Sequence, residues 1–204
     1  MASIRYSFAL IIVCLSIACS QPATPVNNAV NTAPTAVPTP EIADHFAYPI
    51  GKDETVTAKK DGDEWFNELD FGQKDNLGED WTVNKGGNEA CGEPVYAIAN
   101  GVVTYAEHSG PEWGLVMIID HQLPSGEKVQ SLYGNLFDMS VKVGDVVKKR
   151  QQIGRIGNAN GRYLCRLHLE IRTSDAPLWG KPGPIFGKEP KGWIDPSNFI
   201  DAHR

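Results

Sequence analysis

Arg166-Leu167-His168 has the spacing of a catalytic pair, but one of its members has the wrong chemistry. The segment follows a glycine-bounded turn over residues 157–161 and begins a stretch whose composition predicts a strand. Residues two apart on a strand project from the same face, so Arg166 and His168 are expected to lie side by side. Two histidines at this spacing could bind a metal ion and move protons, whereas an arginine stays protonated and does neither.

The composition bounds the class of protein. The chain has 204 residues and a formal net charge of −6, with the two signs well mixed. This length fits one domain with appendages. A nucleic-acid surface would need a basic stripe, so no nucleic-acid partner is expected.

Residues 1–19 predict a secretion signal. Arg5 precedes the apolar stretch 8–17, which is too short for a permanent membrane span. Cys19 follows a small residue, which favours a bacterial lipoprotein signal with lipid on the Cys19 thiol. Ser16 stands where such signals usually have leucine, so ordinary signal cleavage and a retained anchor are the alternatives. All three predict an exported protein, and lipidation predicts a membrane anchor facing the periplasm or cell surface.

Residues 20–44 predict a disordered tether before a domain at 45–204. Pro, Ala, Thr and Asn dominate the tether and no apolar period is present. It could reach on the order of 50 Å. The domain then alternates short apolar segments with turns, which predicts a mainly β fold, an antiparallel sandwich or open barrel with little helix. Asn100-Gly101 predicts a hairpin between a strand at 94–99 and its return strand at 101–106.

Two cysteines, Cys91 and Cys165, lie in the predicted domain. An oxidising compartment favours a disulfide between them, and two buried free thiols are the alternative. A metal-ligand role is disfavoured for Cys165, because its odd offset from His168 places it on the other strand face.

Several segments together resemble the lysostaphin/LytM-type zinc metallopeptidases (peptidase family M23) of bacterial cell walls. The resemblance covers roughly residues 46–200 and implies the LytM type of β fold, with its duplicated hybrid motif. The residues that carry it are Gly92–Ala97 with Asn100–Val103, Trp113-Gly114 with Val116, Ile118 and His121, and Val143–Val147 with Gln152-Ile153-Gly154.

The resemblance also implies a site. The family holds zinc through the histidine and aspartate of H-x-x-x-D and the second histidine of H-x-H. Carried over, these three positions are Asn76, Asp80 and His168. The two histidines that act on water and on the tetrahedral intermediate fall at Asn135 and Arg166.

Three of these five positions therefore lack the imidazole. Arg166 can be neither ligand nor base, and a unit charge about 4 Å away costs roughly 8 kcal/mol against a divalent ion at an effective dielectric of 20. Asn135 cannot supply acid–base help worth about 100- to 10,000-fold. The sequence thus predicts a pseudoenzyme without a cofactor, and zinc only if the site still functions. Arg166 is expected to replace the metal by pairing with Asp80, and also with Glu170 or a ligand carboxylate.

Other roles remain open. Arg166 could instead recognise carboxylates or lactyl groups in peptidoglycan, or keep a residual catalytic role, and Tyr133 could line a binding groove with it. His121, Trp81 and Trp113 are expected to be structural. The predicted function is peptidoglycan or stem-peptide binding, or regulation of a cell-wall hydrolase such as an amidase, which degenerate family members are known to activate. The alternatives are an active zinc endopeptidase that cleaves cross-bridges and a structural or carbohydrate-binding β-module.

Overall fold

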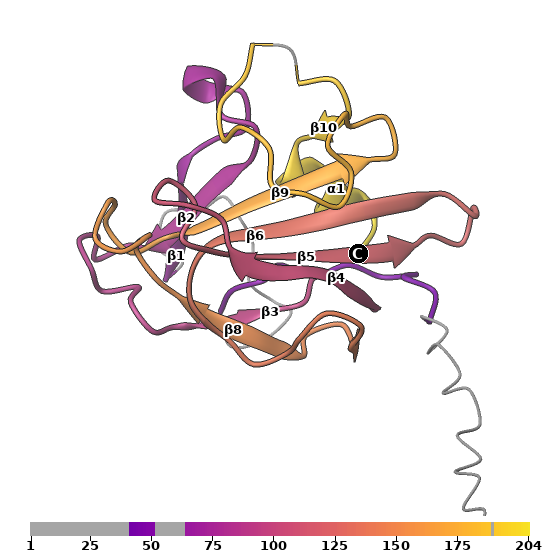
Figure 1. Ribbon diagram of the computed structural model, residues 1–204, viewed down its shortest axis with the longest axis horizontal. Coiled ribbons are helices and arrows are strands. Elements are labelled where there is room, and N and C mark those ends of the chain that lie inside the picture. Colours follow the sequence, from indigo (N-terminus) through magenta and orange to yellow (C-terminus); the bar gives the residue numbers. More distant parts are fainter. Residues whose placement is uncertain (1–40, 52–63, 189) are drawn as a thin grey trace, which may run out of the picture. The chain divides into compact units, whose positions relative to one another are not determined.

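The computed structural model describes residues 41–51, 64–188 and 190–204, and these fold mainly as antiparallel strands (Figure 1). The sheet does not close on itself, so the predicted fold class is confirmed. The elements are β1 (Trp65–Leu69), the 3-10 turn η1 (Gln73–Asp75), β2 (Glu79–Val83), β3 (Pro94–Tyr96), β4 (Gly101–His108), β5 (Leu115–Gln122), β6 (Lys128–Met139), β7 (Val146–Val147), β8 (Gln152–Ile156), β9 (Leu167–Thr173), β10 (Trp193–Ile194) and α1 (Pro196–Ala202).

The strand order brings three distant segments together. It runs β1-β2-β9-β6-β5-β4-β7, with β10 on β9, and with β8 paired to both β3 and β6. On β9, His168 lies opposite Asp80 of β2 on one side and Gly134 of β6 on the other. The long strand β6, coloured salmon in Figure 1, runs beside β9 along this central part of the sheet.

The predicted hairpin at Asn100-Gly101 is wrong. β3 pairs with β8, whereas β4 pairs with β5 and β7. The Asn100 side chain instead ties separate segments together, since its Nδ2 donates to the Ile42 carbonyl and its Oδ1 accepts from the Lys149 amide. A side chain bonded in this way redirects the chain and does not close a two-residue turn.

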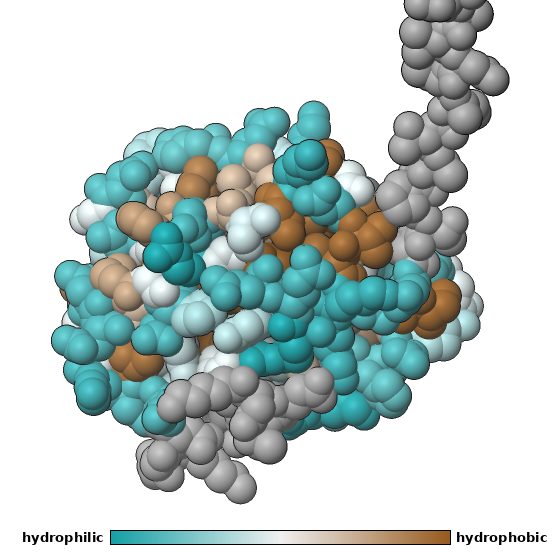
Figure 2. Space-filling view, turned by 90° about the horizontal axis from the view of Figure 1, so that it is seen from below, coloured by the Kyte–Doolittle hydropathy of each residue, from teal (hydrophilic) through white to brown (hydrophobic). Residues whose placement is uncertain are grey.

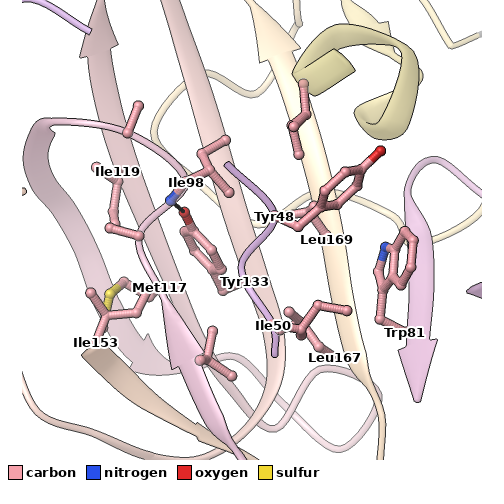
Figure 3. Close-up of a cluster of buried hydrophobic side chains, with 14 of the residues drawn as sticks. Tyr48, Ile50, Trp81, Ile98, Met117, Ile119, Tyr133, Ile153, Leu167 and Leu169 are labelled. Carbon is pink, nitrogen blue, oxygen red and sulfur yellow. Dashed lines mark hydrogen bonds between the residues drawn. The ribbon is translucent and has the colours of Figure 1, made fainter. Parts of the chain in front are cut away.

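β9 is buried on both faces, with an apolar face toward the core. Leu167 and Leu169 pack there with Trp81 and Tyr133 (Figure 3). The Tyr133 hydroxyl accepts a hydrogen bond from the Ile98 amide at 3.0 Å, and Tyr133 is fully buried. Tyr133 is therefore a core residue, which corrects its predicted place in a binding groove.

The C-terminal segment packs back on the sheet. β10 pairs with β9, and Asp195 caps α1 by accepting a hydrogen bond from the Asn198 amide. Ser197 donates to Glu79 at 2.8 Å.

Among the described residues, no helix has the length and hydrophobicity needed to cross a bilayer. At the other end of the domain Ala43 is already buried, two residues before the predicted boundary.

The surface mixes hydrophilic and apolar residues. Figure 2 shows a face on which teal hydrophilic residues surround smaller brown apolar areas. The exposed large apolar side chains of the described chain are Ile42, Phe137, Val143, Leu164, Leu178 and Phe186.

Cys91 and Cys165 form a disulfide across a sequence separation of 74 residues. We expect the Cys91→Ser/Cys165→Ser variant to lose about 2–4 kcal/mol of the free energy of unfolding, because the unfolded chain gains loop-closure entropy. Urea unfolding measures the loss. A reductant should destabilise the wild type by a similar amount and leave the variant unchanged, and equal effects on both would contradict the assignment.

His121 is a buried histidine among neutral partners. Its Nδ1 donates to the Asn100 carbonyl at 2.8 Å, and its Nε2 lies 2.7 Å from the Ser131 hydroxyl. The ring also contacts Phe46 edge-on. Burial lowers the pKa of His121 to about 4, although the bond to the Asn100 carbonyl acts in the opposite direction. The structural role expected for His121 fits these contacts.

This pKa predicts a pH dependence of stability. The unfolded chain binds a proton near the ordinary histidine pKa of 6.5, whereas the folded ring stays neutral down to about 4. We therefore expect this residue to remove about 3 kcal/mol of the free energy of unfolding as the pH falls across that range. Glu79, whose pKa burial raises to about 7, contributes an opposite slope. Comparing urea unfolding of the wild type and His121→Asn isolates the histidine, and equal slopes would contradict the prediction.

Candidate functional site

The outer face of β9 and of the residue before it carries four ionisable side chains at alternate positions: Arg166, His168, Glu170 and Arg172. The spacing continues the two-residue period that placed Arg166 beside His168. His168, Glu170 and Arg172 expose 1% of their surface or less. The strand therefore has one apolar and one ionic face, and both are buried.

His168 is held between two carboxylates. Its Nδ1 lies 2.7 Å from Asp80 Oδ1 and its Nε2 lies 3.3 Å from Glu170 Oε1. Burial alone would lower the pKa of His168, but the hydrogen bonds to Asp80 and Glu170 outweigh it and raise the pKa to about 9. At neutral pH the ring is therefore an imidazolium that donates from both nitrogens. Gly78 permits this approach, because a Cβ there would lie 2.9 Å from His168 Nε2.

Arg166 pairs with Asp80, as expected. Its Nε lies 3.3 Å from Asp80 Oδ2 in an ion pair that is not a hydrogen bond. Its Nη1 donates to Glu68 Oε2 at 3.3 Å. The guanidinium lies over the Tyr163 ring, 4.5 Å from the centroid. Glu68, and not Glu170, is thus the second carboxylate partner of Arg166, which corrects the expected pairing.

Glu170 is bound on its other side by Arg172. Arg172 Nε donates to Glu170 at 2.6 Å, and Trp193 Nε1 donates to the same carboxylate oxygen at 2.8 Å. Six residues of alternating charge therefore follow one another: Glu68, Arg166, Asp80, His168, Glu170 and Arg172. We call this set the ion chain. Alternation gives each buried charge an opposite neighbour, which offsets the cost of removing it from water.

Asn76 and Asn135 are buried beside this set, exposing 1% and 3% of their surface. Asn76 Nδ2 donates to the Leu69 carbonyl at 3.2 Å. Asn135 adopts a positive φ of 59°, a conformation that asparagine tolerates better than most residues. In the described part of the chain neither side-chain oxygen has a hydrogen-bond partner. The two amides thus stay outside the ion chain.

A segment near the C-terminus covers the ionic face. We call residues 178–187 the strap. Trp113 contacts His168 edge-on at 5.3 Å between ring centroids, and its Nε1 donates to the Gly183 carbonyl at 2.9 Å. The strap also accepts a hydrogen bond from the Leu77 amide at Ile185. A ligand therefore cannot reach the Asp80–His168 pair unless Trp113, Arg166 or the strap moves.

The residues at the zinc positions of the LytM-type peptidases do not fit a zinc ion. A catalytic zinc usually needs three protein ligands with free lone pairs. Both ring nitrogens of His168 already face carboxylates, Asn76 offers a neutral oxygen, and Asp80 faces the cationic Arg166. Within the described ranges, no group of three His, Cys, Asp or Glu residues is placed to hold a metal.

Three parts of this site were not predicted. Arg172 could have been found by extending the alternation of Arg166 and His168 along the strand. Glu68 lies 98 residues from Arg166 in the sequence, and no local pattern connects them. The strap carries no motif that singles it out in the sequence.

The fold defines a domain of the LytM/lysostaphin type. The model of peptidase family M23 matches residues 80–179, and the chain belongs to this family. It is 36% identical over 81 residues to lipoprotein NlpD of Yersinia enterocolitica, spanning 40% of this chain and 78% of that one.

Two further proteins are similar to this chain. A lipoprotein NlpD/LppB homolog of Pseudomonas aeruginosa is 34% identical over 99 residues, which is 48% of this chain but only 32% of the relative. A chain in the SpoIIQ–SpoIIIAH pore-forming complex shares the fold, with a TM-score of 0.51, 21% identity, and coverage of 78% of this chain and 92% of that one.

Proposed function

We propose that this protein is an exported, lipid-anchored cell-wall protein whose M23 domain is catalytically inactive. The observation that supports it is the ion chain. In it, Arg166 and His168 balance the negative charge of Asp80, and His168 also faces Glu170, so no zinc ion is needed to balance the carboxylates. Arg166 and Asn135 also leave the family's two water-activating positions without a group that titrates near neutral pH.

The proposed role is binding to peptidoglycan stem peptides, or control of a cell-wall hydrolase such as an amidase. Relatives that bear the name NlpD support the cell-wall setting. The structural neighbour in a complex with SpoIIIAH supports partner binding as a use of this fold. A closed site is compatible with both roles, since neither requires a water molecule beside a metal.

The test uses the purified full chain, zinc and isolated sacculi. We expect no release of muropeptides and no stoichiometric zinc, together with retention on sacculi or a change in amidase rate. Stoichiometric zinc that is lost in His168→Ala, with release of peptides, would favour the active endopeptidase. Absence of both retention and any effect on a hydrolase would favour a structural or carbohydrate-binding module.

The proposed anchor is tested separately at Cys19. The wild-type protein should incorporate labelled palmitate and fractionate with membranes. The Cys19→Ser variant should lose both the label and the membrane association. Labelling that persists in Cys19→Ser would contradict lipidation at this thiol.

A further inference from the structure

We propose that the exposed edge of Arg166 is a binding site for the free carboxylate of a peptide, and that Glu68 occupies this site as an internal competitor. The inference rests on the proposed function only in taking the peptide from the cell wall. It concerns the rim of the ion chain, where solvent can reach the guanidinium.

Arg166 has hydrogen-bond donors that are not used among the described residues. A guanidinium carries five N–H groups in a planar fork that matches a carboxylate. Within the described part of the chain, one hydrogen bond from this side chain is found, from Nη1 to Glu68. The Arg166 side chain is 19% exposed, so an incoming group can reach this edge without opening the buried part of the site.

The two carboxylates on Arg166 differ in how easily they can be exchanged. Asp80 is 3% exposed and is held by His168 at 2.7 Å. Glu68 is 40% exposed and makes a single contact of 3.3 Å. A ligand carboxylate that displaces Glu68 preserves the alternation of charge, whereas a neutral amide leaves Arg166 with one carboxylate fewer. The site therefore selects a carboxylate over its amide.

The neighbouring residues fix the orientation of the guanidinium. Tyr163 lies under its plane at 4.5 Å, which leaves the edge of the fork for the ligand. Leu164, two residues before Arg166, is 51% exposed and offers an apolar surface. This combination suits a peptide that ends in a small apolar residue such as alanine.

The experiment titrates the ¹⁵N-labelled full chain with N-acetyl-alanyl-alanine and, separately, with its C-terminal amide. We expect shifts at Arg166 and Tyr163 for the acid and none for the amide. Glu68→Gln should bind the acid about tenfold more tightly, because the competitor is gone, and Arg166→Lys about tenfold more weakly, because the fork is lost. Glu107→Gln, an exposed carboxylate on β4, is the matched control and should change nothing.

Equal binding of acid and amide would overturn the proposal, and so would an unchanged affinity in Glu68→Gln. Glu68 is half-exposed, so its variant is expected to fold even if Arg166→Lys does not. Retention on sacculi is measured with the same proteins. A chain that is retained but insensitive to Glu68 would refute the carboxylate site and leave the cell-wall role standing. A wild type that is neither retained nor alters the rate of a hydrolase would refute that role.

Discussion

Glu170→Gln is expected to lower the free energy of unfolding by about 3–5 kcal/mol, because it removes one partner from a buried set of charges. Glu170 is fully buried and accepts hydrogen bonds from His168, Arg172 and Trp193. A glutamine keeps the shape but leaves the fully buried Arg172 without an anion. Urea unfolding at pH 7 measures the change.

A matched control separates this effect from the chemistry of the substitution. Glu107→Gln changes the same groups on an exposed part of β4 and should alter stability by no more than about 0.5 kcal/mol. If Glu170→Gln loses no more than this control, the strap carbonyls that accept from Arg172 at Leu178 and Lys181 suffice to hold the cation. The ion chain would then contribute little to stability.

Restoring three imidazoles is expected to restore zinc binding. The variant Asn76→His/Asn135→His/Arg166→His removes the cation beside Asp80 and supplies a third ligand. Even a third of the roughly 8 kcal/mol repulsion between a guanidinium and a divalent ion corresponds to about a hundredfold in affinity. Titration against a competing chelator should therefore show a gain of at least about two orders of magnitude over the wild type.

The two contributions to this gain can be separated. Arg166→Gln removes the charge without adding an imidazole, so it should recover only part of the affinity. A triple variant that remains folded and binds zinc no better than the wild type would show that the strap and Trp113, and not the substituted side chains, keep the ion out.

The sequence predicts the β9 site well where the prediction depends on the two-residue period of a single strand. Alternation along the strand placed Arg166 and His168 on one face. The resemblance to the LytM-type peptidases placed Asp80 beside them, and the charge of Arg166 then suggested the pairing. The turn chemistry of Asn100-Gly101 misled, because the Asn100 side chain bonds to Ile42 and Lys149, which a two-residue pattern cannot anticipate.

Contacts between distant segments escaped prediction for a different reason. Glu68 was not singled out, since many exposed carboxylates could have reached Arg166. Tyr133 was expected to line a groove, but its burial depends on how β6 packs against the loop at Ile98. Side-chain chemistry indicates which residues could form a site. Whether solvent can reach them depends on packing between distant segments, which no short motif encodes.

The strap makes its hydrogen bonds to its neighbours largely through peptide groups. It offers the carbonyls of Leu178, Lys181, Gly183 and Ile185 and the amide of Gly187, and none of these depends on which side chain the residue carries. The backbone path therefore makes most of the cover, to which the Ile185 side chain adds its packing against the cluster around Trp113, whereas outward side chains such as Phe186 are free to diverge. Homologues with a strap of equal length should keep an equally closed site even where the strap sequences have little in common.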